Sequence, residues 1–110
     1  MKVMFDQQFV DLDGLVIEDE KKRAFTLRIT VTNALLANTD EDKSVTGEEK
    51  LKRWELALKI KNSSDPVDVT VEEASLLKKL LTRIYGTIIV GQAYKLLEDK
   101  KSEKAAVPNH

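Results

Sequence analysis

The chain has 110 residues, no cysteine, and a single histidine at its last position, His110. Apolar residues make up 42% of the chain, charged residues make up 34%, and the formal net charge is −1. This length accommodates one domain. Most nucleophilic and metal-binding sites depend on cysteine or histidine side chains, which this chain almost entirely lacks. We therefore expect a non-enzymatic protein with no cofactor and no metal site. The near-neutral charge also gives no strong overall attraction for nucleic acid or an anionic membrane.

No apolar run approaches the roughly 20 residues of a membrane-spanning helix, and the N-terminus lacks the pattern of a secretory signal. We expect a cytoplasmic protein that makes no membrane contact. The predicted organisation is a single small domain over residues 1–98, followed by a disordered polar tail over residues 99–110. No internal repeat is evident in the sequence.

The N-terminal segment from Val3 to Ile17 is predicted to form a β-hairpin. Apolar residues at 9–12 and 15–17 flank Asp13-Gly14, a dipeptide typical of tight two-residue turns with positive φ angles. An isolated hairpin is marginal in water, so its apolar face is expected to pack against helices or another subunit. The mixed charges of residues 18–23 then predict a solvated loop.

Residues 25–38 are compatible with a strand or a helix. Alternation over residues 27–32 is typical of a strand, whereas the spacing of Leu27, Val31, Ala34 and Leu35 is typical of a helix. We favour the helix, capped by Thr26 and ended by residue 38 in a left-handed conformation.

The next predicted helix runs from Gly47 to about Lys61 and begins at a capping box formed by residues 46 and 49. Pairs of opposite charge at i,i+4 are expected on its surface, namely Glu48–Lys52, Glu49–Arg53 and Glu55–Lys59. The helix carries two apolar stripes on nearly opposite sides: one is Leu51, Trp54 and Leu58, and the other is Leu56, Ala57 and Ile60. A surface helix needs one such stripe for the core.

A break at residues 62–66 and a short extended segment at 67–69 precede a second capping box at residues 70 and 73. The box starts a predicted helix from Val71 to about Tyr85 with one broad apolar stripe. A last helix is predicted from Ile88 to Glu98, with Thr87 as its cap.

The acidic segment from Asp40 to Ser44 has the alternating acids of a calcium loop. That loop also needs glycine at its sixth position and glutamate at its twelfth, where this chain has Val45 and Leu51. Calcium binding is therefore not expected. No other pair of carboxylates or glycine-rich stretch stands out as a catalytic or phosphate-binding site.

Basic residues do not form an uninterrupted stripe. Those of the helix at 47–61 are scattered and interleaved with glutamates, and the cluster of Lys78, Lys79 and Arg83 is small. Nucleic acid is thus possible but not favoured as a partner. Trp54 has two alternative roles: the main aromatic residue of the core, or, with Leu51 and Leu58, the centre of a surface that binds a partner or a second copy of the chain.

Several motifs resemble small proteins of uncertain function encoded by bacteriophages and prophages. They are DLDG (11–14), NALLA (33–37), GEEKLKRWELALKI (47–60), VDVTVEE (67–73) and VGQAYKLLE (90–98). This resemblance implies a viral or prophage accessory protein, and it transfers no catalytic residue.

We therefore expect an α+β domain, mainly helical, in which an N-terminal β-hairpin packs on three to four helices. The favoured function is that of a non-enzymatic phage accessory protein that self-associates or binds a host or phage protein. The alternatives are a small nucleic-acid-binding or regulatory protein, and a structural or assembly protein of the virion.

Overall fold

The computed structural model describes residues 1–98, so the tail predicted at 99–110 lies outside the described residues. The elements in chain order are β1 (Lys2–Val3), α1 (Leu27–Leu36), a 3-10 helix η1 (Asp40–Asp42), α2 (Gly47–Asn62), β2 (Val67–Asp68), α3 (Val71–Ile84) and α4 (Thr87–Leu97). The prediction of a mainly helical α+β fold with an N-terminal hairpin against the helices is confirmed.

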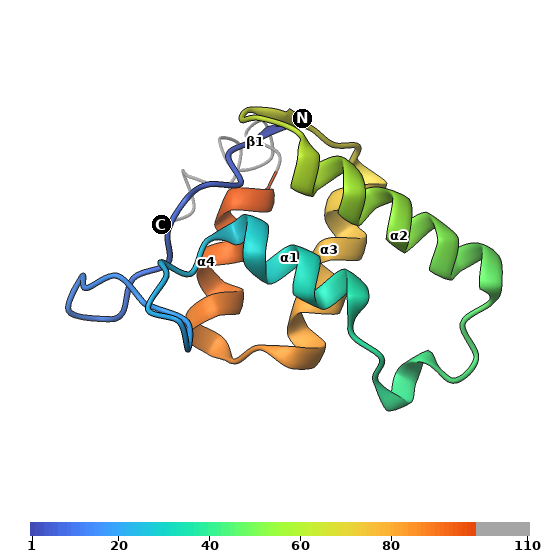
Figure 1. Cartoon of the computed structure of the whole chain (residues 1–110), viewed down its shortest axis with the longest axis horizontal. Helices are drawn as coiled ribbons and strands as arrows, with labels where there is room; N and C mark the ends of the chain where they lie inside the picture. The colour runs from blue at the N-terminus through green and yellow to red at the C-terminus, as the bar shows by residue number, and fades with distance from the viewer. Residues whose placement is uncertain (99–110) are drawn as a thin grey trace, which may run out of the picture.

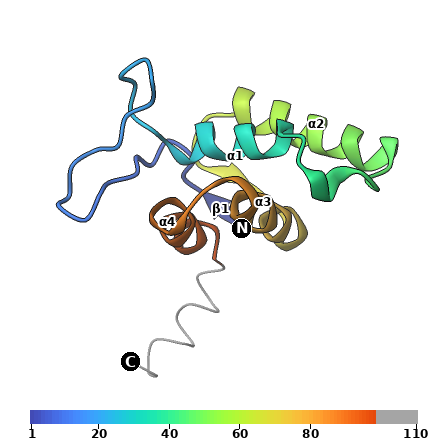
Figure 2. The same ribbon diagram turned by 90° about the horizontal axis from the view of Figure 1, so that it is seen from below.

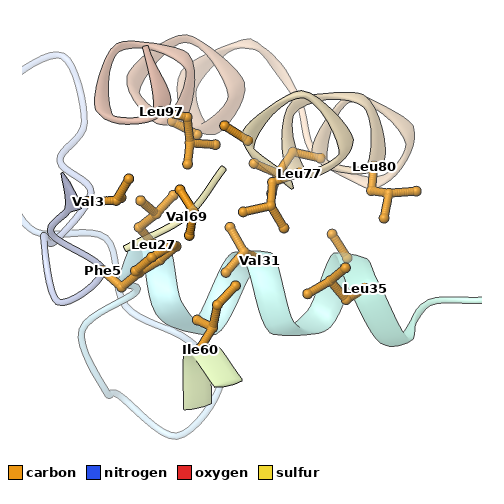
Figure 3. Packing of buried hydrophobic residues seen from close by; sticks show 14 of the residues in the cluster. Val3, Phe5, Leu27, Val31, Leu35, Ile60, Val69, Leu77, Leu80 and Leu97 are labelled. Carbon is orange, nitrogen blue, oxygen red and sulfur yellow. The ribbon is translucent and has the colours of Figure 1, made fainter. Parts of the chain in front are cut away.

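The helices form two layers with α1 at the centre (Figures 1 and 2). One layer holds α1 and α2, and the other holds α3 and α4. Helix α1 contacts both α2 and α3. In Figure 3, Leu27, Val31 and Leu35 of α1 lie among apolar side chains of the surrounding elements. This central position buries α1 almost entirely along one face and explains the helical spacing of its apolar residues.

The ambiguous segment at residues 25–38 is a helix, as predicted, and Thr26 is its N-cap. The Thr26 hydroxyl accepts a hydrogen bond from the N–H of Ile29 at 3.3 Å. The predicted C-terminus is wrong. Helix α1 ends at Leu36, its C-cap Ala37 is extended with φ −68°, and Asn38 does not adopt the left-handed conformation.

The caps of the other helices are partly as predicted. Thr70 and Glu73 form the expected capping box of α3. At α2, the Thr46 hydroxyl accepts from the N–H of Glu49 at 3.1 Å, but within the described residues the Glu49 side chain returns no bond. Thr87 is not a cap, because Gly86 occupies the N-cap position and α4 begins at Thr87 itself.

The N-terminal hairpin belongs to a closed ring of three short extended segments. The N–H of Ile17 donates to the carbonyl of Phe9 at 2.9 Å, and the N–H of Phe25 donates to the carbonyl of Ile17 at 2.7 Å. The ring closes where the N–H of Phe9 donates to the carbonyl of Phe25 at 2.8 Å. Phe9 is fully buried, and the rings of Phe9 and Phe25 meet edge to face with centroids 6.5 Å apart. The ring therefore docks on the helices through one apolar side.

Two turns of the same construction connect the segments of this ring. The carboxylate of Asp11 accepts from the N–H groups two and four residues later, and Asp19 does the same eight residues further along the chain. Gly14 (φ +83°) and Lys22 (φ +61°) occupy the same left-handed position in the two turns. The two turns have only the aspartate in common, so they are similar in structure without forming a sequence repeat.

The first turn also differs in detail from the predicted one. The N–H of Asp11 donates to the carbonyl of Leu15 at 2.8 Å, which leaves a three-residue loop, and only Gly14 in this loop has a positive φ. The apolar side chains at the tip do not pack on the helices: Leu12 is 97% exposed.

The two named strands join the N-terminus to the segment between α2 and α3, in a pairing that the sequence does not reveal. Strand β1 pairs antiparallel with β2, Val3 opposite Val67. The N-terminal ammonium group donates to the carbonyl of Val69 at 2.8 Å. The predicted extended segment at 67–69 thus anchors the N-terminus.

We predict opposite effects of substitution at the two equivalent turn positions. Gly14→Ala forces a residue with a side chain into the left-handed region, and this backbone strain should lower the free energy of unfolding by about 1–2 kcal/mol. Steric clash adds nothing to this cost, because no neighbouring atom lies within 4 Å of the added Cβ. Lys22→Gly removes the same strain and should raise this free energy by about 0.5–1 kcal/mol. Urea unfolding measures both changes. Gly91→Ala, inside α4, is the control and should be stabilising; a neutral Gly14→Ala variant would contradict the proposed strain.

Candidate interaction surface

Helix α2 has one face in the core and another in solvent. Its buried residues are Arg53, Leu56, Ala57 and Ile60. The opposite stripe is exposed: Leu51 by 56%, Trp54 by 51% and Leu58 by 39%. We call these three residues the α2 outer face. The alternative in which Trp54 is the main core aromatic residue is therefore wrong, and the aromatic residues of the core are Phe5 and Phe9.

Helix α2 lies at the edge of the molecule (Figure 1). On one flank, Lys50 lines a small cavity of about 210 Å³ beside the C-terminal end of α1. On the other flank, Glu55 lines an open groove of about 430 Å³ between α2 and α3. The apolar stripe is thus bordered by Lys50 on the α1 side and by Glu55 on the α3 side, where Lys52 and Lys59 line the same groove.

A buried carboxylate fixes the N-terminal half of α2. Asp42, at the end of η1, has a side chain that is 3% exposed and accepts from Arg53 Nη1 at 2.9 Å and from Arg83 Nη1 at 2.7 Å. It also accepts from the backbone N–H of Thr39 at 2.9 Å. This carboxylate therefore connects the acidic loop to α2 through Arg53 and to α3 through Arg83.

The same contacts change the acidity of this group. The hydrogen bond from the Thr39 N–H, followed by the bond from the Arg53 guanidinium, holds the pKa of the Asp42 carboxyl well below its usual range. Asp42 is therefore ionised under all ordinary conditions in the folded protein.

The C-terminal end of α2 is held by Arg28 of α1. Its Nη1 donates to the carbonyl oxygens of Ile60 and Ser63, and its Nη2 lies 3.2 Å from Asp65 Oδ1. Asp65 also accepts from the N–H groups of Phe5 and Asp6 at 2.8 and 2.7 Å. A cation at the C-terminus of a helix interacts favourably with the helix dipole, so Arg28 stabilises this end of α2.

The predicted i,i+4 ion pairs on α2 are wrong. Arg53 pairs with Asp42, Lys59 pairs with Glu73 at 3.3 Å, and Glu48–Lys52 forms no ion pair within the described residues. The i,i+4 spacing of these charges predicts partners within the helix, whereas the partners of Arg53 and Lys59 come from other elements.

Two of the three basic residues in the cluster at 78–83 contact other residues of the domain. Of the cluster at residues 78–83, the ammonium group of Lys78 lies 5.3 Å from the ring centroid of Tyr94, and Arg83 binds Asp42. Of the three residues, only Lys79 is exposed.

A second exposed apolar region lies at the tip of the first turn. Leu12, Ile88 and Gly91 line an open depression of about 510 Å³. Gln92 of α4 fixes the turn there, because its side chain donates to the carbonyl of Val10 at 2.8 Å and accepts from its N–H at 3.1 Å. This region is composed of parts of two elements, whereas the α2 outer face is a single helical stripe.

We predict that Asp42→Asn lowers the free energy of unfolding by about 3 kcal/mol at pH 7, because Arg53 loses its anionic partner and Arg83 keeps only the longer contact to Glu41 at 3.6 Å. The folded-state pKa of Asp42 is depressed, so its stabilisation is complete above about pH 5 and decreases as the pH falls through the ordinary carboxyl range. The difference between wild type and Asp42→Asn should therefore shrink between pH 5 and pH 3 in urea unfolding. Asp40→Asn, in the same loop but exposed, is the matched control; an equal effect of the two substitutions would contradict the role of Asp42.

Among residues 1–98, no helix is long and apolar enough to cross a membrane. In the same residues, no three acidic, histidine or cysteine side chains converge in a way that could hold a metal ion.

Comparisons with models of protein families, with curated proteins and with solved structures find no match for this chain.

Proposed function

We propose that this chain is a non-enzymatic interaction protein that acts through the α2 outer face. The observation that carries the proposal is the exposure of Leu51, Trp54 and Leu58 on a helix whose other face is already buried. The motifs that resemble bacteriophage and prophage proteins support a role as a phage accessory protein in the cytoplasm of a bacterial host.

The chemistry of this surface suits protein binding. Tryptophan buries a large area at a small entropic cost and is enriched among the residues that dominate interface energetics. Leu51 and Leu58 are two helical turns apart, and Trp54 lies between them about one turn from each, so the three side chains form one stripe. Burial of this stripe by a partner removes apolar area from water and supplies the driving force for association.

The anchoring of α2 supports the same role. Asp42 fixes the first half of the helix and Arg28 fixes its C-terminal end. A surface held at both ends is organised before a partner arrives, which reduces the entropy lost on binding.

We predict that Trp54→Ala leaves the domain folded and abolishes its association. Far-UV circular dichroism and the melting temperature should stay close to wild type, because half of the Trp54 side chain is already in solvent. Sedimentation of the purified protein and capture of partners from bacterial lysate measure the association. Loss of binding follows from removal of the main apolar side chain of the surface.

Two control variants separate surface from core. Leu56→Ala, on the buried face of the same helix, should lower the free energy of unfolding by about 2–5 kcal/mol. Leu12→Ala removes an exposed leucine from the distant turn and should leave both folding and association unchanged. If Trp54→Ala and Leu58→Ala both retain wild-type association, the α2 outer face is not the interaction surface.

A further inference from the structure

We infer that the occupant of the α2 outer face is a second copy of this chain, with the two α2 helices side by side and parallel. This inference rests on the proposed function and specifies its partner. The evidence is the spacing of the apolar stripe and the placement of charges on its two flanks.

The apolar stripe has the spacing of a coiled-coil seam. Leu51 and Leu58 are separated by one heptad, and Trp54 lies three residues after Leu51, so the three residues take the a, d and a positions. A two-fold axis brings the same stripe of two copies together, which makes the contact self-complementary.

The flanks carry opposite charges. In this register Lys50 takes a g position, on the α1 side, and Glu55 takes an e position, on the α3 side. Both are exposed, and neither forms an ion pair with another residue in the described range 1–98. Their charges are therefore available to an approaching chain.

The two possible orientations place these charges differently. In a parallel pair, a g residue lies beside the e residue five positions later in the other helix, so Lys50 of each copy meets Glu55 of the other. In an antiparallel pair, e positions face e positions, which brings Glu48 and Glu55 of the two copies together. Charge complementarity thus selects the parallel dimer.

The buried side chains of α2 lie mostly on the side away from the stripe, and Ala57, which takes a g position, is the flanking residue that the domain itself covers. Leu56 and Ile60 face the core on the side of α2 away from the stripe, so a helix seated on the stripe lies opposite the body of each copy. The seam spans only two helical turns, so the area that it can bury is smaller than the roughly 800 Å² per partner of a standard interface. We therefore expect a dissociation constant in the micromolar range and a concentration-dependent dimer.

Charge reversal in the full-length chain tests the arrangement by sedimentation equilibrium. Lys50→Glu and Glu55→Lys each turn two attractive contacts into repulsive ones and should raise the dissociation constant about tenfold or more. The double variant Lys50→Glu/Glu55→Lys restores both contacts and should return to within about twofold of wild type. An equimolar mixture of the two single variants should form heterodimers in preference to either homodimer. Circular dichroism confirms that each variant is folded.

A disulfide reports the orientation directly, because the chain contains no native cysteine. In the parallel dimer the two copies of residue 58 face each other, so Leu58→Cys should form a covalent dimer on mild oxidation. Leu12→Cys, equally accessible at the distant turn, is the control and should remain monomeric on a non-reducing gel. In an antiparallel dimer an a position faces a d position of the partner, so the two copies of residue 58 lie apart and Leu58→Cys alone would not cross-link.

Three results would overturn the inference: a wild-type chain that stays monomeric up to millimolar concentration, single charge reversals without effect on dimerisation, or a dimer that Glu55→Gln strengthens. The proposed function fails by a different result, in which Trp54→Ala retains all association. If the wild-type chain is monomeric and Trp54→Ala loses the binding of another protein, the surface function stands and the second copy is excluded as its occupant.

Discussion

The docking of α2 on α1 is the constraint on which the rest of the structure depends. Helix α2 is rich in charged residues and offers the core only three apolar side chains, namely Leu56, Ala57 and Ile60. Such a narrow contact leaves the rotation of the helix weakly specified. The additional specification comes from charges at its two ends, where Asp42 binds Arg53 of the helix and Arg28 binds the last carbonyl groups. Together they determine which side of α2 faces solvent.

Each anchoring carboxylate collects donors from several parts of the chain. Asp65 joins the N-terminal segment to α1, and Asp42 joins the loop before α2 to both α2 and α3. Among residues 1–98, no fully buried side-chain nitrogen or oxygen lacks a hydrogen-bonding partner. Because removal of one member of such a cluster leaves the others buried without a partner, these contacts favour one arrangement of the helices over alternatives. The α2 outer face is a consequence of that arrangement.

The ring of turns at the N-terminus meets a different requirement. Short extended segments cannot satisfy their backbone groups alone, and here three of them bond to one another in a closed circuit. The side chains that point from this circuit to the helices include Phe9, which is fully buried. Gln92 supplies a further pair of bonds from α4 to Val10. The turns can therefore be held in place with few apolar contacts of their own.

The four helices are predictable from the sequence within one residue at most ends, because hydrophobic spacing and the capping threonines Thr26, Thr46 and Thr70 act locally. The sequence also showed two apolar stripes on α2 without showing which of them is buried. The choice depends on Arg53, Asp42 and Arg83, whose contacts join residues up to 41 positions apart. The pairing of Val3 with Val67, the closed ring of turns and the bond partners of the arginines were likewise decided only by the tertiary structure, since long-range pairing leaves no periodic signal in the chain.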